Sequence, residues 1–182
     1  MNPAEDTRNL VDKFKGLPNE EVVRQLDQSR TPLEIAIENL AHDFNIGTIV
    51  RNANAFNISR VHIIGKRKYN RRGAMVTDKY LHIDHFATVD EFVSDARARG
   101  KRLVAIENNR PESRPLQQSK VSANSILIFG SESDGISQEL LNRVDQCFYI
   151  EQLGSTRSIN VGCASAIAMY EVLRRLEAFK DA

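Results

Sequence analysis

The pattern that most constrains the fold of this chain is a repeated alternation of short apolar runs with helical patterns. Ile, Leu, Val and Phe are nearly continuous in these runs, which lie at residues 60–65, 102–107, 125–130 and 147–150. Helical patterns separate them: one begins at Asn45, one covers 89–99, a short one follows Ser137, and a long one closes the chain. Nearly continuous apolar strands are typical of parallel sheets that helices cover on both faces. The sequence therefore predicts an α/β fold with a parallel sheet between helical layers.

The predicted core begins at "PLEIAIENL", residues 32–40. Leu33, Ile35 and Ile37 alternate there with polar or small residues, which is typical of a strand. Upstream, residues 3–28 contain two short polar helical patterns. We expect residues 1–30 to form a short N-terminal helical extension and residues 31–182 to form one domain. The extension either contacts a partner or packs on the domain, and we expect packing.

Composition excludes several classes of protein. Hydrophobic residues make up 41% of the chain and charged residues 27%, as in ordinary globular proteins, and no apolar run approaches the ~18 residues of a membrane span. The polar, acidic N-terminus is unlike a secretion signal. Cys147 and Cys163 form no CxxC pair and have no nearby His, which argues against a zinc site or a disulfide framework. We expect a cytoplasmic protein without a membrane segment or a metal.

Positive charge is concentrated in one short stretch, although the net charge is only +1. Between residues 60 and 72 there is no acidic residue, and Tyr69 stands among the cations. The basic residues are Arg60, Lys66, Arg67, Lys68, Arg71 and Arg72. This pattern fits a local nucleic-acid-binding patch or a solvated loop, and the charges alone do not decide between the two.

The loop "GSESDGIS" at residues 130–137 follows a predicted strand, where ligands bind in open α/β sheets. It is not a phosphate loop, because Ile136 stands where that motif requires Lys after the second glycine. Acidic residues between Gly130 and Gly135 favour a neutral or cationic ligand. A tight turn with Ser137 as the helix N-cap would also explain the glycines, but it leaves Glu132 unexplained.

The predicted helix in "HDFNIGTIVRNANAFN", residues 42–57, carries a second candidate site. Asn45 is a suitable N-cap residue, and Gly47, Arg51 and Asn54 align at spacings i, i+4 and i+7. Glycine inside a helix costs about 1 kcal/mol relative to alanine, so something needs the space at Gly47. The sequence leaves two interpretations open, a ligand beside Arg51 or a packing contact at Gly47 with Arg51 in solvent.

The last helix follows the loop "EQLGSTRS", residues 151–158, and begins with many small residues. Small side chains allow another part of the backbone to approach closely. The small residues are Gly162, Ala164, Ser165, Ala166 and Ala168.

These three segments resemble the motifs of the SpoU/TrmH branch of the SPOUT superfamily of RNA methyltransferases. The third motif ends in S-[LI]-N-V followed by small residues, which corresponds to "SINVGCASAIAMYE" at residues 158–171. The first two motifs are NxGxxxR, matched by Asn45, Gly47 and Arg51, and GxExxG, matched by Gly130, Glu132 and Gly135. The motifs occur in order over residues 45–171, most of the chain.

The resemblance implies a Rossmann-like parallel sheet whose C-terminal part is threaded into a deep trefoil knot, an exception to the rule that folds are not knotted. It implies that S-adenosylmethionine is held in a bent shape among the knot loops, and that its methyl group passes to a ribose 2′-hydroxyl of tRNA or rRNA. It also implies a homodimer that pairs through the C-terminal helix and the first-motif helix.

The resemblance further implies roles for individual residues, and the charge pattern adds others. Arg51 would be the central catalytic residue, assisted by Asn45, Glu132, Ser158 and Asn160. The cofactor would be bound by Ile106, Gly130, Ile150, Leu153, Gly154 and Ile159. RNA would be bound by Lys66, Arg67, Lys68, Arg71, Arg72 and Arg157.

One departure and three alternatives accompany this interpretation. Glu151 stands where family members commonly have Pro, which makes the loop before the last helix unusually polar. The alternatives are a non-catalytic RNA-binding member of the fold, a SPOUT methyltransferase that modifies a base atom, and a nucleotide-dependent oxidoreductase. The complete motif residues argue against the first, Arg51 argues against the second, and the lack of a glycine fingerprint after the first strand argues against the third.

Overall fold

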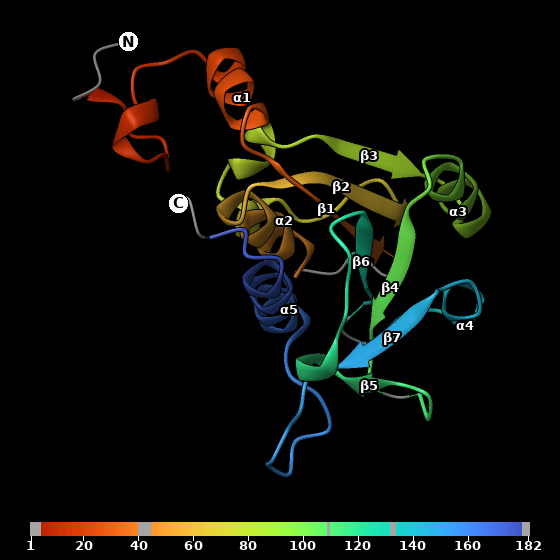
Figure 1. The fold of residues 1–182 in the computed structure, drawn as a ribbon. Coiled ribbons are helices and arrows are strands. Elements are labelled where there is room, and N and C mark those ends of the chain that lie inside the picture. The colour runs from red at the N-terminus through yellow and green to blue at the C-terminus, as the bar shows by residue number, and fades with distance from the viewer. Residues whose placement is uncertain (1–4, 40–44, 109, 132–133, 180–182) are drawn as a thin grey trace.

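The computed structural model describes residues 5–39, 45–108, 110–131 and 134–179, which fold around one seven-stranded sheet (Figure 1). The strand order is β3-β2-β1-β6-β4-β7-β5, and all neighbouring strands are parallel. The strands are β1 (Thr31–Asn39), β2 (Ile58–Gly65), β3 (Ile83–Phe86), β4 (Arg102–Ile106), β5 (Arg114–Pro115), β6 (Ser125–Phe129) and β7 (Gln146–Tyr149). The expected α/β fold with a parallel sheet is confirmed, whereas the short edge strands β3 and β5 were not expected.

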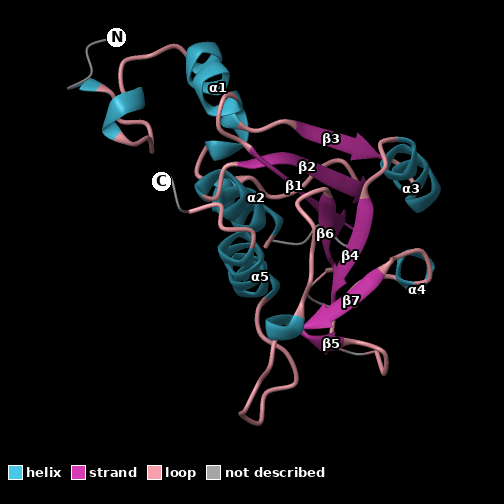
Figure 2. Ribbon diagram, in the orientation of Figure 1, coloured by secondary structure: helices cyan, strands magenta, loops and turns pink. Residues whose placement is uncertain are grey.

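Helices cover both faces of the sheet (Figure 2). The helices are α1 (Asn19–Asp27), α2 (Ile46–Ala55), α3 (Val89–Ala98), α4 (Gln138–Leu141) and α5 (Val161–Arg175). Residues of α2 and α5 share one core cluster with Ile35, Leu127 and other strand residues that face them. Residues of α3 and α4 share a second cluster on the opposite face, with alternate strand residues such as Ala36 and Ile128. Strand residues of both faces are therefore buried, as the continuous apolar runs predict. Among the described residues, no helix is both long enough and apolar enough to span a membrane.

The N-terminal segment is less helical than the sequence predicts. Of the two helices expected in residues 3–28, the second is α1, whereas the described part of the first contains a short 3₁₀ helix over Asp12–Phe14 and no α-helix. Phe14 and Val22 are buried together with Tyr80, which forms a small cluster apart from the two main cores. Asp6 adds a polar anchor, because it accepts hydrogen bonds from the Arg8 side chain and from the Gly16 N–H.

The alternating pattern of β1 correctly predicts a strand, but its two glutamates are buried beneath the second helical layer. Glu34 is only 4% exposed and Glu38 only 2%. The Glu34 carboxylate lies 2.6 Å from His62 Nε2, 2.8 Å from an Arg99 guanidinium nitrogen and 2.8 Å from Lys101 Nζ. Burial disfavours the charged carboxylate, but the hydrogen bonds from these partners outweigh that effect and lower the pKa of Glu34 from 4.5 to about 2.

The lowered pKa of Glu34 predicts a specific acid sensitivity. Because its carboxyl binds protons more weakly in the folded state, its contribution to stability is present above pH 4.5 and is lost as the pH falls towards 2. A shift of this size corresponds to about 3 kcal/mol of unfolding free energy. Chemical unfolding of the wild type and of Glu34→Gln between pH 7 and pH 3 measures this contribution to the free energy of unfolding. The stability gap between the two proteins should shrink as the pH falls, and a constant gap would contradict this account.

Candidate active site

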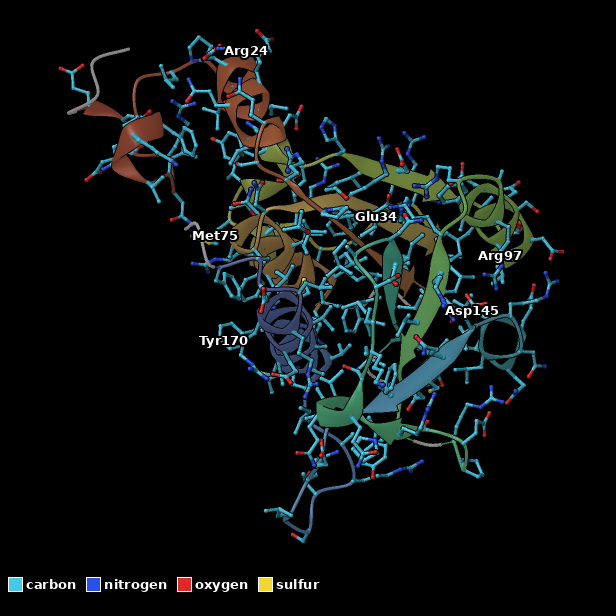
Figure 3. The ribbon with its side chains drawn as sticks, in the orientation of Figure 1. Arg24, Glu34, Met75, Arg97, Asp145 and Tyr170 are labelled. Atoms are coloured by element: carbon cyan, nitrogen blue, oxygen red, sulfur yellow. The ribbon has the colours of Figure 1, made fainter. Side chains whose placement is uncertain are left out.

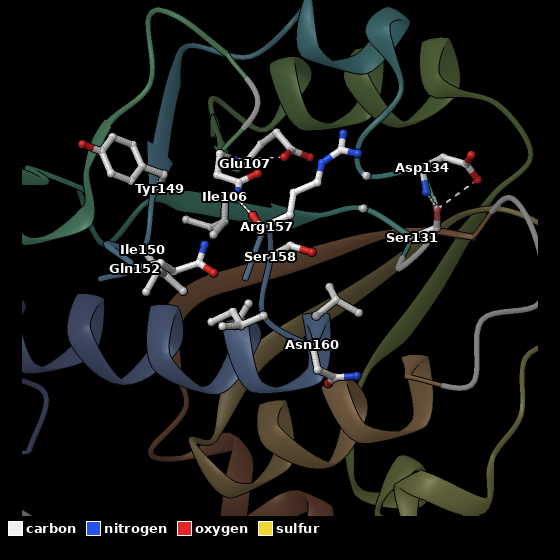
Figure 4. Close-up of a pocket in the computed structure, with 16 residues that line it drawn as sticks. Ile106, Glu107, Ser131, Asp134, Tyr149, Ile150, Gln152, Arg157, Ser158 and Asn160 are labelled. Carbon is white, nitrogen blue, oxygen red and sulfur yellow. Dashed lines mark hydrogen bonds between the residues drawn. The ribbon is translucent and has the colours of Figure 1, made fainter. Parts of the chain in front are cut away.

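A pocket of about 310 Å³ lies at the carboxyl ends of β4, β6 and β7, where the chain continues into α5 (Figure 4). In the sheet, β4 lies between β6 and β7, so the segments that follow three adjacent strands converge on one opening. Figure 4 shows Ser131 and Asp134 at one end of the pocket and Tyr149, Ile150 and Gln152 at the other. The carboxyl edge of a parallel sheet is the usual ligand site in open α/β folds, and this volume is at the lower end of the ~300–1,000 Å³ range of small-molecule pockets.

The glycine loop after β6 forms one wall of the pocket by folding tightly back on itself. The main chains of Ser131 and Gly135 exchange two hydrogen bonds of 3.0 Å. A Cβ atom at Gly130 would lie 2.0 Å from the carbonyl carbon of Gly135, so no side chain fits there. Gly135 has φ of +70°, and Ser137 caps α4 by accepting the Leu140 N–H. The tight-turn interpretation is thus confirmed, while Glu132 lies outside the described residues.

Glu107 connects this loop to the end of β4. Its Oε2 accepts the Ile136 N–H at 3.2 Å, and its Oε1 accepts the Asn108 N–H at 2.9 Å. A Cβ atom at Gly135 would lie 2.5 Å from the same Oε2. The Glu107 carboxylate therefore fixes two pocket loops relative to each other. Glu107 is not among the site residues that the sequence predicts, although its place at the end of an apolar strand is an available signal.

The first and third motifs meet where α5 begins. Asn160 caps α5, because its Oδ1 accepts the N–H groups of Gly162 at 2.9 Å and Cys163 at 3.2 Å. Its Nδ2 donates to Asn45 Oδ1 at 2.8 Å, across 115 residues of sequence. Asn45 occupies the N-cap position of α2, as expected, but its side chain makes no capping hydrogen bond there. The asparagine of the first motif instead contacts the asparagine of the third.

Close packing between α2 and α5 explains the small residues of the last helix. A Cβ atom at Gly162 would lie 2.9 Å from Thr48 Cγ2, and Ser165 and Ala168 are fully buried. Asn52 of α2 donates to the Gly162 carbonyl at 2.8 Å and to Ser165 Oγ at 3.0 Å. Two helices that carry different motifs are thus held together by steric fit and by hydrogen bonds.

Gly47 is a packing contact, as one of its two interpretations proposed. A Cβ atom there would lie 2.7 Å from the Asn70 carbonyl oxygen and 2.9 Å from the Ala74 nitrogen. Arg51, one turn further along α2, is exposed, and its side chain has no hydrogen-bond or ion-pair partner among the described residues. It does not line the pocket, whereas Ser158 and Asn160 do.

The predicted cofactor residues fall into two groups. Ile106, Gly130, Ile150 and Ile159 line the pocket. Leu153 and Gly154 do not: the Leu153 side chain is fully exposed, and a Cβ atom at Gly154 would meet nothing within 4 Å. Pocket residues that the sequence analysis did not assign to it include Glu107, Asn108, Tyr149, Gln152 and Arg157.

Gln152 is the most informative of these additional pocket residues. Its Oε1 atom is buried and has no hydrogen-bond partner in the described structure. A buried acceptor without a partner is costly unless a ligand or water supplies a donor.

The described residues contain no group of three or more His, Cys, Asp or Glu side chains arranged to hold a metal.

The basic residues predicted to bind RNA are exposed. Lys66, Arg67, Lys68, Arg71 and Arg72 lie on the segment that follows β2, and Arg157 lies in the loop before α5. Tyr69 is partly buried against the main core, and the Arg71 guanidinium lies 5.8 Å from the centre of its ring. Arg157 also lines the pocket, and its carbonyl accepts a hydrogen bond from Asn108 Nδ2.

These features define an α/β protein with a ligand pocket at the carboxyl edge of a parallel sheet and with a neighbouring basic surface. Comparison with known proteins gives the family: residues 32–170 match the model of the SpoU rRNA Methylase family, and the chain belongs to it. The chain is 24% identical over 159 residues to a tRNA (guanosine(18)-2′-O)-methyltransferase of Escherichia coli strain K12, which covers 85% of this chain and 68% of that protein.

The fold is shared with solved structures of other proteins. The TrmH/SpoU tRNA modifying enzyme of A. aeolicus matches with a TM-score of 0.76 and 24% identity, over 89% of this chain and 86% of the other. An AdoMet-bound rRNA methyltransferase from Sinorhizobium meliloti matches with a TM-score of 0.72 and 24% identity, over 83% of this chain and 60% of the other.

The geometry at Gly130 predicts a large effect of a small substitution. In Gly130→Ala, the added methyl group would overlap main-chain atoms of Gly135 and Ile136, which cannot move as a flexible side chain can. We expect a loss of about 3 kcal/mol or more of unfolding free energy. Gly154→Ala is the matched control, because its Cβ enters open space and should leave stability nearly unchanged. Equal melting temperatures for the two variants would refute the tight-turn geometry.

Proposed function

We propose that this chain is an S-adenosylmethionine-dependent methyltransferase that modifies a ribose 2′-hydroxyl of tRNA or rRNA. Membership of the SpoU family supports the class of reaction, as does the similarity to a tRNA 2′-O-methyltransferase. The observation that carries the proposal is the contact between Asn45 and Asn160. It joins the first and third motifs beside a pocket that the second motif lines, which supports a single site built from all three.

The pocket fits S-adenosylmethionine in its chemistry. Side chains of Ile106, Ile150 and Ile159 give it apolar walls of the kind that a purine ring requires, and the unpartnered Gln152 Oε1 offers an acceptor to a ligand donor. The pocket lining also contains the acidic residues Glu107 and Asp134, which suit a ligand that carries a sulfonium and an ammonium group. We propose that Gly130 and these isoleucines bind the cofactor. We also propose that Leu153 and Gly154 approach it from the loop between Ile150 and Ile159. When bound, S-adenosylmethionine supplies a methyl group on a cationic sulfur, which leaves as a neutral thioether.

The chain's own residues must handle the ribose hydroxyl, which is a very weak acid. The hydroxyl oxygen forms a bond to the methyl carbon, and its O–H bond breaks. The negative charge that develops on this oxygen needs stabilisation. A guanidinium does not deprotonate in proteins, so Arg51 is not the base. We propose that Arg51 stabilises the developing alkoxide or holds the adjacent phosphate with two hydrogen bonds, while the proton leaves to phosphate or water. Asn45, Ser158, Asn160 and Glu132 would position the nucleotide.

Finer features of the architecture are part of the same proposal. We infer that the C-terminal part is threaded into a deep trefoil knot, and that residues 1–30 are a packing extension of a methyltransferase domain at 31–182. The hydrogen bond from Asn108 to the Arg157 carbonyl supports the threading, since it draws the loop before α5 towards the end of β4. As an enzyme of tRNA or rRNA, the protein would work in the cytoplasm.

We also infer a homodimer that pairs through α5 and α2. Tyr170 of α5 is 52% exposed, and its ring stacks on Phe179 at 5.4 Å and contacts Phe56 at 6.3 Å. Met75 is equally exposed and lies on the same side of the molecule (Figure 3). An exposed apolar surface of this kind is typical of a protein–protein interface.

Substitution of Arg51 tests the catalytic proposal. Arg51→Lys keeps the charge but loses the planar fork, so methyl transfer from labelled S-adenosylmethionine to total RNA should fall about 100-fold or more. Calorimetry should find unchanged S-adenosylmethionine affinity, since Arg51 lies outside the pocket lining. Arg97→Lys on α3 is the matched control and should stay active. Retention of most activity in Arg51→Lys would contradict the role of the fork.

Substitution of Tyr170 tests the dimer. Tyr170→Glu places a charge in the apolar surface, so light scattering at micromolar concentration should change from dimer to monomer. Glu139→Lys on α4, which covers the other face of the sheet, should remain dimeric. A wild type that is monomeric at all concentrations would refute the interface.

A further inference from the structure

The exposed basic segment, residues 66–72, is held from below by a buried asparagine. Asn39 is the last residue of β1 and is fully buried. Its Nδ2 donates to two carbonyl groups of the segment, that of Lys66 at 2.5 Å and that of Lys68 at 3.1 Å. Its own carbonyl accepts the Lys66 N–H at 3.0 Å. One buried residue thus fixes the first part of the segment through three hydrogen bonds.

The other end of the segment is held by glycines. A Cβ atom at Gly73 would lie 2.9 Å from the Thr48 nitrogen and 3.1 Å from the Gly47 carbonyl carbon. The reciprocal Cβ at Gly47 would meet the Asn70 carbonyl oxygen. The main chain just after the basic residues therefore packs directly against the first turn of α2, the helix that carries Arg51. Between the two anchors, Tyr69 packs against the core.

This arrangement combines an anchored backbone with exposed charges. Lys66, Arg67 and Lys68 are exposed, as are Arg71 and Arg72. A solvated loop that served only solubility would need no buried side chain to satisfy its carbonyls, since water would do so. Cations on a fixed backbone lose less conformational freedom when they bind phosphates.

We propose that Asn39 is a positioning residue for RNA binding. It holds the basic segment so that its cations meet the phosphates of the RNA next to the nucleotide that Arg51 engages. This inference rests on the proposed function and deepens it. It identifies a residue that acts on RNA affinity through the backbone of the segment and does not touch the RNA itself.

The salt dependence of RNA binding tests this role, because a general loss of stability would not change it. Each phosphate contact contributes roughly one to the slope of log K against log salt. In Asn39→Ala, we expect the dissociation constant for total tRNA at 100 mM salt to rise about tenfold, and the slope to fall by about one to two. The affinity for S-adenosylmethionine should be unchanged. Asn124→Ala removes a similar bond, from Nδ2 to the Gly100 carbonyl at 3.0 Å, and should alter neither quantity.

A double-mutant cycle shows whether Asn39 acts through the segment. With Lys66, Arg67 and Lys68 all replaced by Ala, adding Asn39→Ala should weaken RNA binding no further. The same tenfold loss in that background, or an unchanged salt slope in the single variant, would overturn the inference.

If Asn39→Ala does not fold, Gly73→Ala tests the other anchor with the same readouts and the same expected loss. A wild type that binds no RNA would refute the proposed function as well, whereas RNA binding with an unchanged slope would overturn this inference alone.

Discussion

The close packing of three segments at the first turn of α2 is the constraint on which the rest of the site depends. On one side, Gly47 contacts the main chain of residues 70–74, and on the other, Thr48 contacts Gly162 at the start of α5. Asn52 adds hydrogen bonds to Gly162 and Ser165. These bonds fix how α5 is rotated relative to α2, in addition to the distance between the two helices. A single methyl group at any of these glycines would separate the elements. The glycines therefore determine where the three motifs lie relative to one another, although glycine has no side chain that could take part in the reaction.

This packing divides the proposed chemistry between two neighbouring places. The pocket is built from strand ends and from the start of α5, with both apolar and polar side chains in its lining, a buried Gln152 acceptor and a tightly folded glycine loop. Arg51 on α2 and the basic residues of the segment after β2 are exposed, so a polyanion can reach them. The Asn45–Asn160 hydrogen bond spans the junction. A small cofactor and a large RNA would thus approach from different sides and meet at that junction, which is the arrangement that methyl transfer between them requires.

The sequence predicts the local features of this molecule well and its long-range contacts poorly. Continuous apolar runs gave the central strands, and Ser137 was identified as a cap because a cap bonds within its own helix turn. Asn45 occupies the predicted N-cap position of α2, but the sequence does not show that its side chain bonds a residue 115 positions away. The burial of Glu34 is likewise not visible in the sequence, because its partners His62, Arg99 and Lys101 lie far from it along the chain. Likewise, the charges of residues 66–72 are visible in the sequence, but their anchorage by Asn39 is not. The family motifs located most of the pocket lining, whereas Glu107 and Gln152 needed the fold.

The most direct test of the central claim is the position of the transferred methyl group. Total RNA from a strain that lacks this protein would be incubated with the protein and isotopically labelled S-adenosylmethionine, digested to nucleosides and analysed by mass spectrometry. Our account predicts label on the ribose of one nucleoside, at its 2′-oxygen, and a strong loss of that label with Arg51→Lys. Label on a base atom, or RNA that acquires no label at any concentration of the protein, would contradict it.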